Sequence, residues 1–121
     1  MAILGSDLIQ AFLEGDSRAK SKVDELAKFH HLSTTAVEAF ELFKLADDKL
    51  KMNALQGLLE NLEVLPFTTE ASEKAANLEQ EYKGLDLEVV FSSAATLAHN
   101  DMIISRNKQF DRIKGLKVEG W

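Results

Sequence analysis

Short apolar runs alternate with longer amphipathic stretches along the chain. The runs at residues 2–4, 32–34, 64–67, 102–104 and 116–118 have the length of β-strands. Between them, apolar residues recur at three- and four-residue spacing, which predicts helices. Strands that alternate with helices form a parallel sheet with helices packed on its faces. The pattern therefore predicts an α/β fold of three layers, in which helices cover both sides of a central, mainly parallel sheet.

The predicted helices are bounded by local signals. Ser6 and Thr69 stand where a helix needs an N-terminal cap, and Gly84 stands where a helix would end. Pro66 places the third predicted strand at a sheet edge or at a strand end. Residues 88–99 are apolar on most sides, as in a buried helix. In the helices that begin near residues 35 and 50, we expect the inward positions to be Val37, Phe40, Leu45, Leu50, Ala54, Leu55, Leu58 and Leu62.

Composition narrows the chemistry that the chain can support. A length of 121 residues fits one domain, which we expect to span residues 1–121. With no cysteine and only three histidines, the expected metal ligands are carboxylates. No apolar run approaches the ~20 residues that a membrane-spanning helix needs, so we expect a soluble, cytoplasmic protein that binds no membrane. The net charge of −6 disfavours nonspecific binding of nucleic acid unless basic groups or bound cations offset the repulsion.

Candidate site residues follow the predicted strands, because ligands of an open parallel sheet bind beyond the carboxyl ends of its strands. The segments concerned are residues 5–7, 34–41 and 105–109. Glu41 stands out among them, because it follows Val37 by one helical turn, on or near a helix face that should point into the protein. A partly buried carboxylate needs a partner, which is a metal ion, a cationic side chain or a hydrogen-bond donor.

Three stretches of the sequence carry a family resemblance: ILGSDLIQAFLEGD near the N-terminus, STTAVEAFELFKLA in the middle and SSAATLAHNDMIISRNKQFDRIKGLKVEGW at the C-terminal end. Together they resemble the PIN domains of VapC-type ribonucleases. The resemblance covers essentially the whole chain, and SRNKQF followed by GLKVEGW carries most of it. It implies a PIN-like α/β/α fold whose carboxylates gather at one end of the sheet and hold Mg²⁺ or Mn²⁺ for RNA cleavage.

Most of the acidic positions that this resemblance implies are not acidic here. The first aspartate falls on Gly5, and the aspartate that opens the small-residue helix falls on Val89. The acid after the fourth strand falls on Asn107, and an auxiliary acid or histidine falls on Gln109. The glutamate of the Glu-Leu helix is kept as Glu41, and the substrate-contacting positions correspond to Ser6, Ser105 and Arg106.

The substitutions at Gly5, Val89 and Asn107 lead us to expect a catalytically degenerate PIN domain that acts as a binding or interaction module. The resemblance implies a homodimer, and for toxin members an antitoxin-like protein partner whose segment lies across the groove. The apolar surface around Phe40, Phe43 and Leu58 is a candidate interface, although core packing explains it equally well.

Two other functions stay open. One is an active endoribonuclease that depends on Mg²⁺ or Mn²⁺, in which Glu41 acts with Asp7 and with Asp86 or Glu88. The other is RNA binding without cleavage, through Arg106, Lys108 and Arg112.

The acids also have structural interpretations. Asp7 is either a metal ligand or a first-turn acid that complements the helix dipole. Glu41 either binds a metal weakly, or pairs with Arg106, or is a satisfied remnant of an ancestral site. Asp86 and Glu88 suit a helix cap and a first-turn acid.

Overall fold

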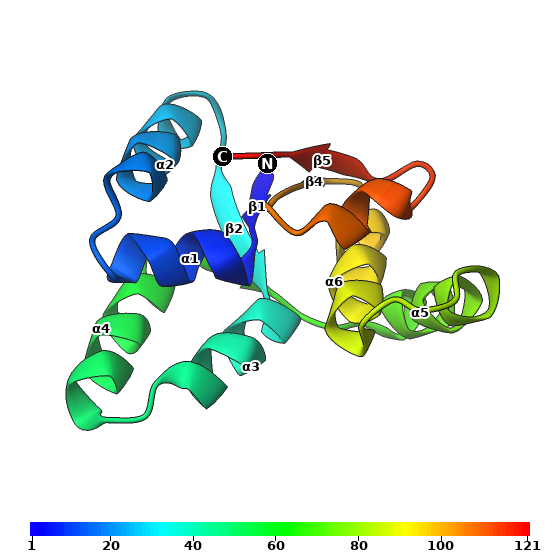
Figure 1. The fold of residues 1–121 in the computed structure, drawn as a ribbon, viewed down its shortest axis with the longest axis horizontal. Coiled ribbons are helices and arrows are strands. Elements are labelled where there is room, and N and C mark those ends of the chain that lie inside the picture. The colour runs from blue at the N-terminus through cyan, green and yellow to red at the C-terminus, as the bar shows by residue number, and fades with distance from the viewer.

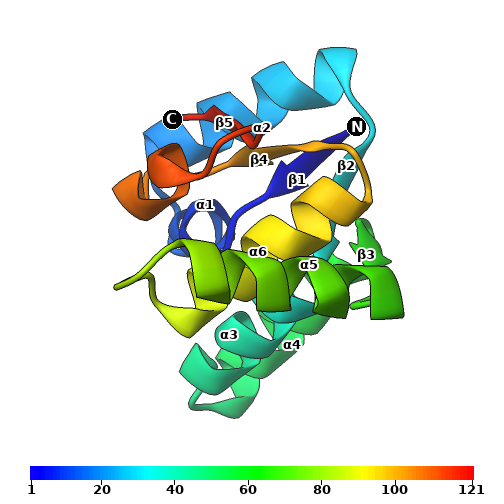
Figure 2. The ribbon, with the colours of Figure 1, turned by 90° about the vertical axis from the view of Figure 1, so that its right-hand side faces the viewer.

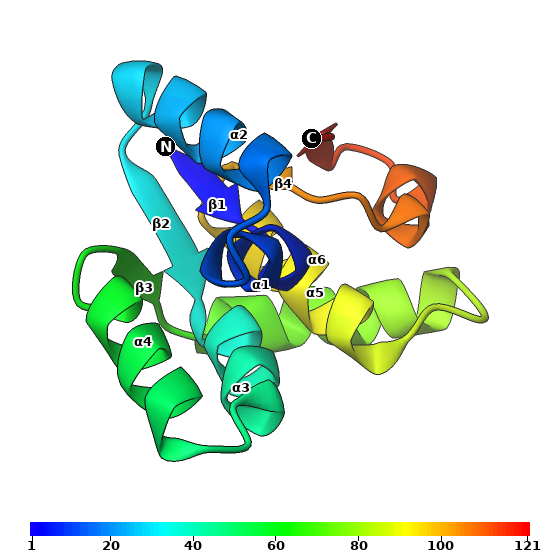
Figure 3. The same ribbon diagram turned by 60° about the vertical axis from the view of Figure 1, so that its left-hand side comes forward.

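Five short parallel strands form the centre of the molecule, in a computed structural model that describes all residues 1–121. They are β1 (Ala2–Leu4), β2 (Leu32–Thr35), β3 (Glu63–Leu65), β4 (Met102–Ile104) and β5 (Lys117–Glu119). Their order in the sheet is β3-β2-β1-β4-β5, and every neighbouring pair runs parallel. Figure 1 labels every strand except β3, which is labelled in Figures 2 and 3. The carboxyl ends of the three inner strands therefore meet at one edge, which is where the sequence places its candidate residues.

Helices cover both faces of this sheet, which confirms the predicted three-layer α/β fold. One face carries α1 (Ser6–Leu13), α2 (Ser17–Phe29), α3 (Ala36–Leu45) and α4 (Lys49–Leu59), with α3 beside α4 (Figure 3). The other carries α5 (Thr69–Glu81), α6 (Leu87–Ala98) and the 3₁₀ helix η1 (Lys108–Arg112), with α5 along α6 (Figure 2). None of the helices combines the length and the apolar character that crossing a membrane requires.

The core is divided by the sheet because side chains alternate along each strand. Leu4 and Ile104 belong to the apolar cluster under α1 to α4, whereas Ile3 and Ile103 belong to the cluster under α5 and α6. The predicted buried helix at residues 88–99 is α6, whose positions 89, 90 and 92–96 are buried.

Several element boundaries differ from the prediction. Ser6 does not cap α1, since the residue before the helix is Gly5 and no side chain caps it. The hydroxyl that caps α5 is that of Thr68, one residue before the predicted Thr69. The segment after β4 forms only the short 3₁₀ helix η1. Pro66 directly follows the edge strand β3, as predicted.

The predicted inward faces of α3 and α4 are partly wrong. Phe40 and Leu50 are 60% and 81% exposed, and Ala54 is exposed as well. The face of α3 that meets the core instead carries Ala39, Leu42 and an acid, Glu38. Apolar residues lie all around α3, so their spacing predicts a helix but does not decide which stripe packs on the sheet.

Candidate functional site

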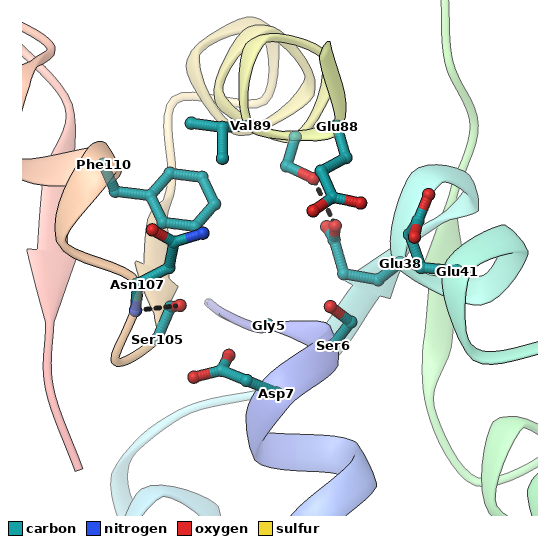
Figure 4. Close-up of a pocket in the computed structure, with 11 residues that line it drawn as sticks. Gly5, Ser6, Asp7, Glu38, Glu41, Glu88, Val89, Ser105, Asn107 and Phe110 are labelled. Atoms are coloured by element: carbon teal, nitrogen blue, oxygen red, sulfur yellow. Dashed lines mark hydrogen bonds between the residues drawn. The ribbon is translucent and has the colours of Figure 1, made fainter. Parts of the chain in front are cut away.

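A small acidic cavity of about 60 Å³ lies at the carboxyl edge of the sheet (Figure 4). Three connections converge on it: the β1–α1 junction, the β2–α3 junction and the segment after β4, with the first turns of α6 on the remaining side. We call this cavity the acidic pocket. Its lining residues are Gly5, Ser6, Asp7, Glu38, Glu41, Glu88, Val89, Ser92, Ser105, Asn107 and Phe110.

Glu38 is the buried acid of the pocket, with only 2% of the residue exposed. It lies in the first turn of α3, where Thr35 caps the helix by accepting from the amides of Val37 and Glu38. The Thr35 hydroxyl donates to Glu38 Oε1 at 2.8 Å, and the Ser92 hydroxyl donates to Glu38 Oε2. Burial raises the pKa of Glu38 to about 7, against the two hydroxyls, which favour the carboxylate. The acid is therefore close to half-protonated at neutral pH.

Glu41 and Glu88 form a pair of carboxylates at the pocket entrance. The Glu41 side chain is 19% exposed, as expected for a partly buried acid, and pairs with Lys44 at 3.2 Å. The expected pairing with Arg106 is wrong. The pKa of Glu88 is raised, mainly because its carboxyl lies within hydrogen-bonding reach of Glu41, and to a smaller extent by burial and by the negative charge of Glu41. Two acids this close favour a shared proton or an external cation.

Asp7 faces away from these glutamates, toward the segment that follows β4 (Figure 4). Its Oδ2 accepts from the backbone N–H of Arg106 at 2.7 Å and from the indole Nε1 of Trp121 at 3.3 Å. The Arg106 guanidinium stacks on the Trp121 ring with 3.4 Å between its carbon and the ring centroid, and its Nε donates to the Trp121 carbonyl. Asp7 is a first-turn acid of α1, as one of its structural interpretations predicts. The Oδ2 atom of its carboxylate is already bonded to these two donors.

The substituted positions lie together in the pocket, as the sequence predicts, but supply little for a metal. A Cβ added to Gly5 would stand 2.7 Å from the backbone oxygen of Ile104. Val89 is 1% exposed and presents only methyl groups. Asn107 caps η1, its Oδ1 accepting from the N–H of Gln109 at 3.0 Å.

The remaining candidates are engaged in local contacts. The hydroxyl of Ser105 accepts from the N–H of Asn107 at 3.0 Å, while Ser6 lines the pocket. Asp86 occupies the N-cap position of α6 without capping it, and its carboxylate accepts from Gln109 Nε2 at 3.0 Å. Arg112 donates to the carbonyl of Lys83.

The residues present do not fit a carboxylate metal centre of the kind that the resemblance implies. Hard divalent cations need several free oxygen ligands. No group of three or more histidine, aspartate or glutamate side chains is arranged to hold a metal ion. Both oxygens of Glu38 receive hydroxyl donors, and the Oδ2 atom of Asp7 receives donors from the chain itself. The pocket instead contains the pair Glu41 and Glu88, whose negative charge suits one cationic group.

Three residues of the site, Glu38, Ser92 and Phe110, are not among the sequence-based candidates, and two of them are polar. Glu38 had a usable signal: Thr35 followed three residues later by a glutamate is the sequence signature of a capping box. That signature predicts that α3 starts at Ala36. It also predicts that the Glu38 side chain points back toward the end of β2. Ser92 had none, because it reaches Glu38 over a separation of 54 residues.

Comparison with known proteins agrees with this geometry. The model of the PIN domain family matches residues 6–116. No curated protein sequence is significantly similar to the chain. The fold is similar to that of a chain in VapBC2 from Rickettsia felis, solved with promoter DNA, at 19% identity and a TM-score of 0.86 over 99% of this chain and 98% of the other.

Two further solved complexes contain a similar chain. VapBC-1 from nontypeable Haemophilus influenzae matches at 19% identity and a TM-score of 0.84, covering 99% of this chain and 97% of the other. A toxin–antitoxin complex from Klebsiella pneumoniae matches at 20% identity and a TM-score of 0.80, covering 96% and 95%. Identities this low establish a shared fold.

Proposed function

We propose that this chain, which belongs to the PIN domain family, is a protein-binding module whose acidic pocket receives a cationic side chain of an antitoxin-like partner. PIN domains in general are metal-dependent nucleases. The solved complexes with a similar chain include one described as a toxin–antitoxin complex. In our proposal this chain keeps the partner-binding role and has lost the metal chemistry.

The observation that carries the proposal is the glutamate pair at the pocket entrance. Glu41 and Glu88 lie close enough to raise the pKa of Glu88, and Lys44 offsets only part of their charge. Glu38 lies deeper in the same pocket. A guanidinium or ammonium group can bond to such a pair as a point charge with several donors, and needs no octahedral set of free oxygens. The pocket volume of about 60 Å³ admits one such group.

The loss of metal chemistry is supported by what has replaced the implied acids. Gly5 has no room for a side chain beside Ile104, and Val89 fills its side of the pocket with methyl groups. Without enough negative oxygen, two divalent ions would repel each other and would not be retained. We assign Glu38, rather than Glu41, as the remaining buried acid of an ancestral site.

We also propose that the chain forms a homodimer through an apolar groove beside the pocket. The groove lies between α3 and α6, and its apolar lining residues are Val37, Phe40, Leu87 and Phe91. Phe40 and Leu87 are 60% and 58% exposed, which is a large apolar area to leave in water. Phe43, from the interface expected by sequence, is 38% exposed on the same helix.

The second candidate function is a metal-dependent endoribonuclease, and the proximity of Glu41 and Glu88 is what favours it. In that case Mg²⁺ or Mn²⁺ would be held by this pair, with Asp7 or Asp86 assisting. Both assisting carboxylates are already bonded, Asp7 to Arg106 and Asp86 to Gln109. RNA binding through Arg106, Lys108 and Arg112 has weaker support, since two of these cations are engaged within the chain.

One titration separates these functions. A hexa-arginine peptide is added to ¹⁵N-labelled protein, and amide shifts are followed in the wild type, in Glu41→Gln/Glu88→Gln and in the control Glu70→Gln/Glu73→Gln, which changes two exposed acids of α5. We expect saturable shifts around the acidic pocket in the wild type and the control, lost in the pocket variant. Equal binding by all three proteins would contradict the proposal. Cleavage of single-stranded RNA in Mn²⁺, abolished by Glu41→Gln, would establish the second candidate.

A further inference from the structure

The side chain of Asp7 joins parts of the chain that are far apart in sequence. It accepts from Arg106, 99 residues away, and from Trp121, 114 residues away. Arg106 in turn holds Trp121 twice, by the bond from its Nε to the Trp121 carbonyl and by stacking on the indole. Asp7, Arg106 and Trp121 thus form a closed cycle of contacts, which we call the clasp.

The clasp borders the acidic pocket on the side of Asn107. A groove of about 650 Å³ runs past the pocket, and its lining includes Asp7, Glu41, Glu88, Arg106 and Trp121. A ligand in this groove would meet the glutamate pair on one side and the clasp on the other. The Asp7 carboxylate is half-buried, and its Oδ2 atom is occupied by the indole and the Arg106 amide, so this oxygen is not free to receive a cation in this state.

Gly120 separates Trp121 from the paired strand β5. β5 is paired with β4, and Glu119 at its end is bound by Lys22 of α2 at 2.6 Å. The residue after it, Gly120, is exposed and has open space around its Cα. Trp121 can therefore leave its place by rotation at Gly120, while the sheet stays intact.

We propose that the clasp is a gate on the acidic pocket: while Trp121 is bound, its indole occupies the Oδ2 atom of Asp7, and release of Trp121 makes this oxygen available to a cation. Asp7 already lines one groove with Glu41 and Glu88. A cationic ligand favours the released state because it gains a further carboxylate oxygen there, and it replaces the indole N–H as a partner of Asp7. The ligand-driven step rests on the proposed function, whereas the clasp itself does not.

The chain contains one tryptophan, so its fluorescence reports on the clasp directly. In the free protein, Asp7→Ala removes the acceptor for the indole, and we expect the acrylamide quenching constant of Trp121 to rise roughly twofold as local opening becomes more frequent. Arg106→Lys, which removes the stacked guanidinium and keeps the charge, should act in the same direction. The matched control is Asp24→Ala, an exposed acid of α2, which should leave quenching unchanged. Quenching that is the same in Asp7→Ala, Arg106→Lys and the wild type would overturn the clasp.

The gate is tested with the hexa-arginine peptide, using calorimetry for binding and fluorescence for Trp121. We expect binding to increase quenching toward the level of Asp7→Ala. Binding by calorimetry without a change in quenching overturns the gate and leaves the proposed function standing. Absence of binding overturns the proposed function and the gate with it, while the clasp is still judged by the variants in the free protein.

Discussion

The backbone nitrogen of Gly5 donates to the carbonyl oxygen of Ile104 at 2.9 Å, and the same oxygen lies 2.7 Å from the place that a Cβ of residue 5 would take. The ends of β1 and β4 are thus closed against each other at the position where the PIN resemblance implies an aspartate. The Asp7 Oδ1 atom, 2.8 Å from the same place, fills the remaining space. Any side chain at residue 5 would therefore have to displace the carbonyl of Ile104 and the carboxylate of Asp7.

The first prediction concerns this close approach. Gly5→Ala should lower the free energy of unfolding by about 1–3 kcal/mol, because the added methyl must push a backbone carbonyl aside. Urea denaturation measures the change. The control is Gly57→Ala, in the interior of α4 with open space around it, which should raise stability by about 0.5–1 kcal/mol. If Gly5→Ala were as stable as the wild type, the strand ends would be less tightly closed than we infer.

The second prediction follows from the pKa of Glu38, raised by burial from 4.5 to about 7. Because the folded protein binds this proton more tightly than the unfolded chain, the contribution of Glu38 to stability is complete below pH 4.5 and is lost as pH rises through about 7. A shift of this size corresponds to roughly 3 kcal/mol. Glu38→Gln keeps the shape and cannot ionise.

The measurement is the free energy of unfolding of both proteins from pH 4 to pH 8, by denaturant titration. We expect Glu38→Gln to gain stability relative to the wild type as the pH rises across this window. If the free energy of unfolding of the two proteins changed in parallel with pH, the pKa of Glu38 would not be raised by burial as we infer.

The third prediction concerns the apolar groove between α3 and α6. Phe40→Asp and Leu87→Asp should each shift a dimer to a monomer, because a charge would be buried at the interface. Leu50→Asp is the control, since Leu50 is 81% exposed on α4 and does not line the groove. Analytical ultracentrifugation gives the mass. A monomeric wild type, or a dimer that survives both substitutions, would contradict the proposed homodimer.

Local patterning carried most of the fold prediction. Apolar runs such as Met102–Ile104 and stretches such as residues 88–99 have only one regular structure that suits them, and alternation of the two predicts a covered parallel sheet. The orientation of α3 could not be predicted in this way. Phe40 and Leu45 look like core residues, but the face that packs inward carries Glu38 and Leu42, because Thr35 and Ser92 satisfy the acid.

The sequence predicted where the site lies in the fold, but it predicted only some of the contacts within the site. Gly5, Val89 and Asn107 do lie together: the ends of β1 and β4 determine the positions of Gly5 and Asn107, and Val89 comes from the start of α6. The bond from Trp121 to Asp7 spans 114 residues and depends on how the last strand is placed, which no local pattern encodes. The close approach of Gly5 to the carbonyl of Ile104 likewise depends on how β1 and β4 pack together in the sheet.

The central claim is that the acidic pocket binds a cationic side chain of a partner and does not bind a divalent metal ion. Calorimetric titration of the wild-type chain with MnCl₂ tests it most directly. We predict no saturable heat up to millimolar Mn²⁺, because the carboxylates that remain are bonded or too few. Stoichiometric Mn²⁺ binding at micromolar concentration that disappears in Glu41→Gln/Glu88→Gln would contradict the claim.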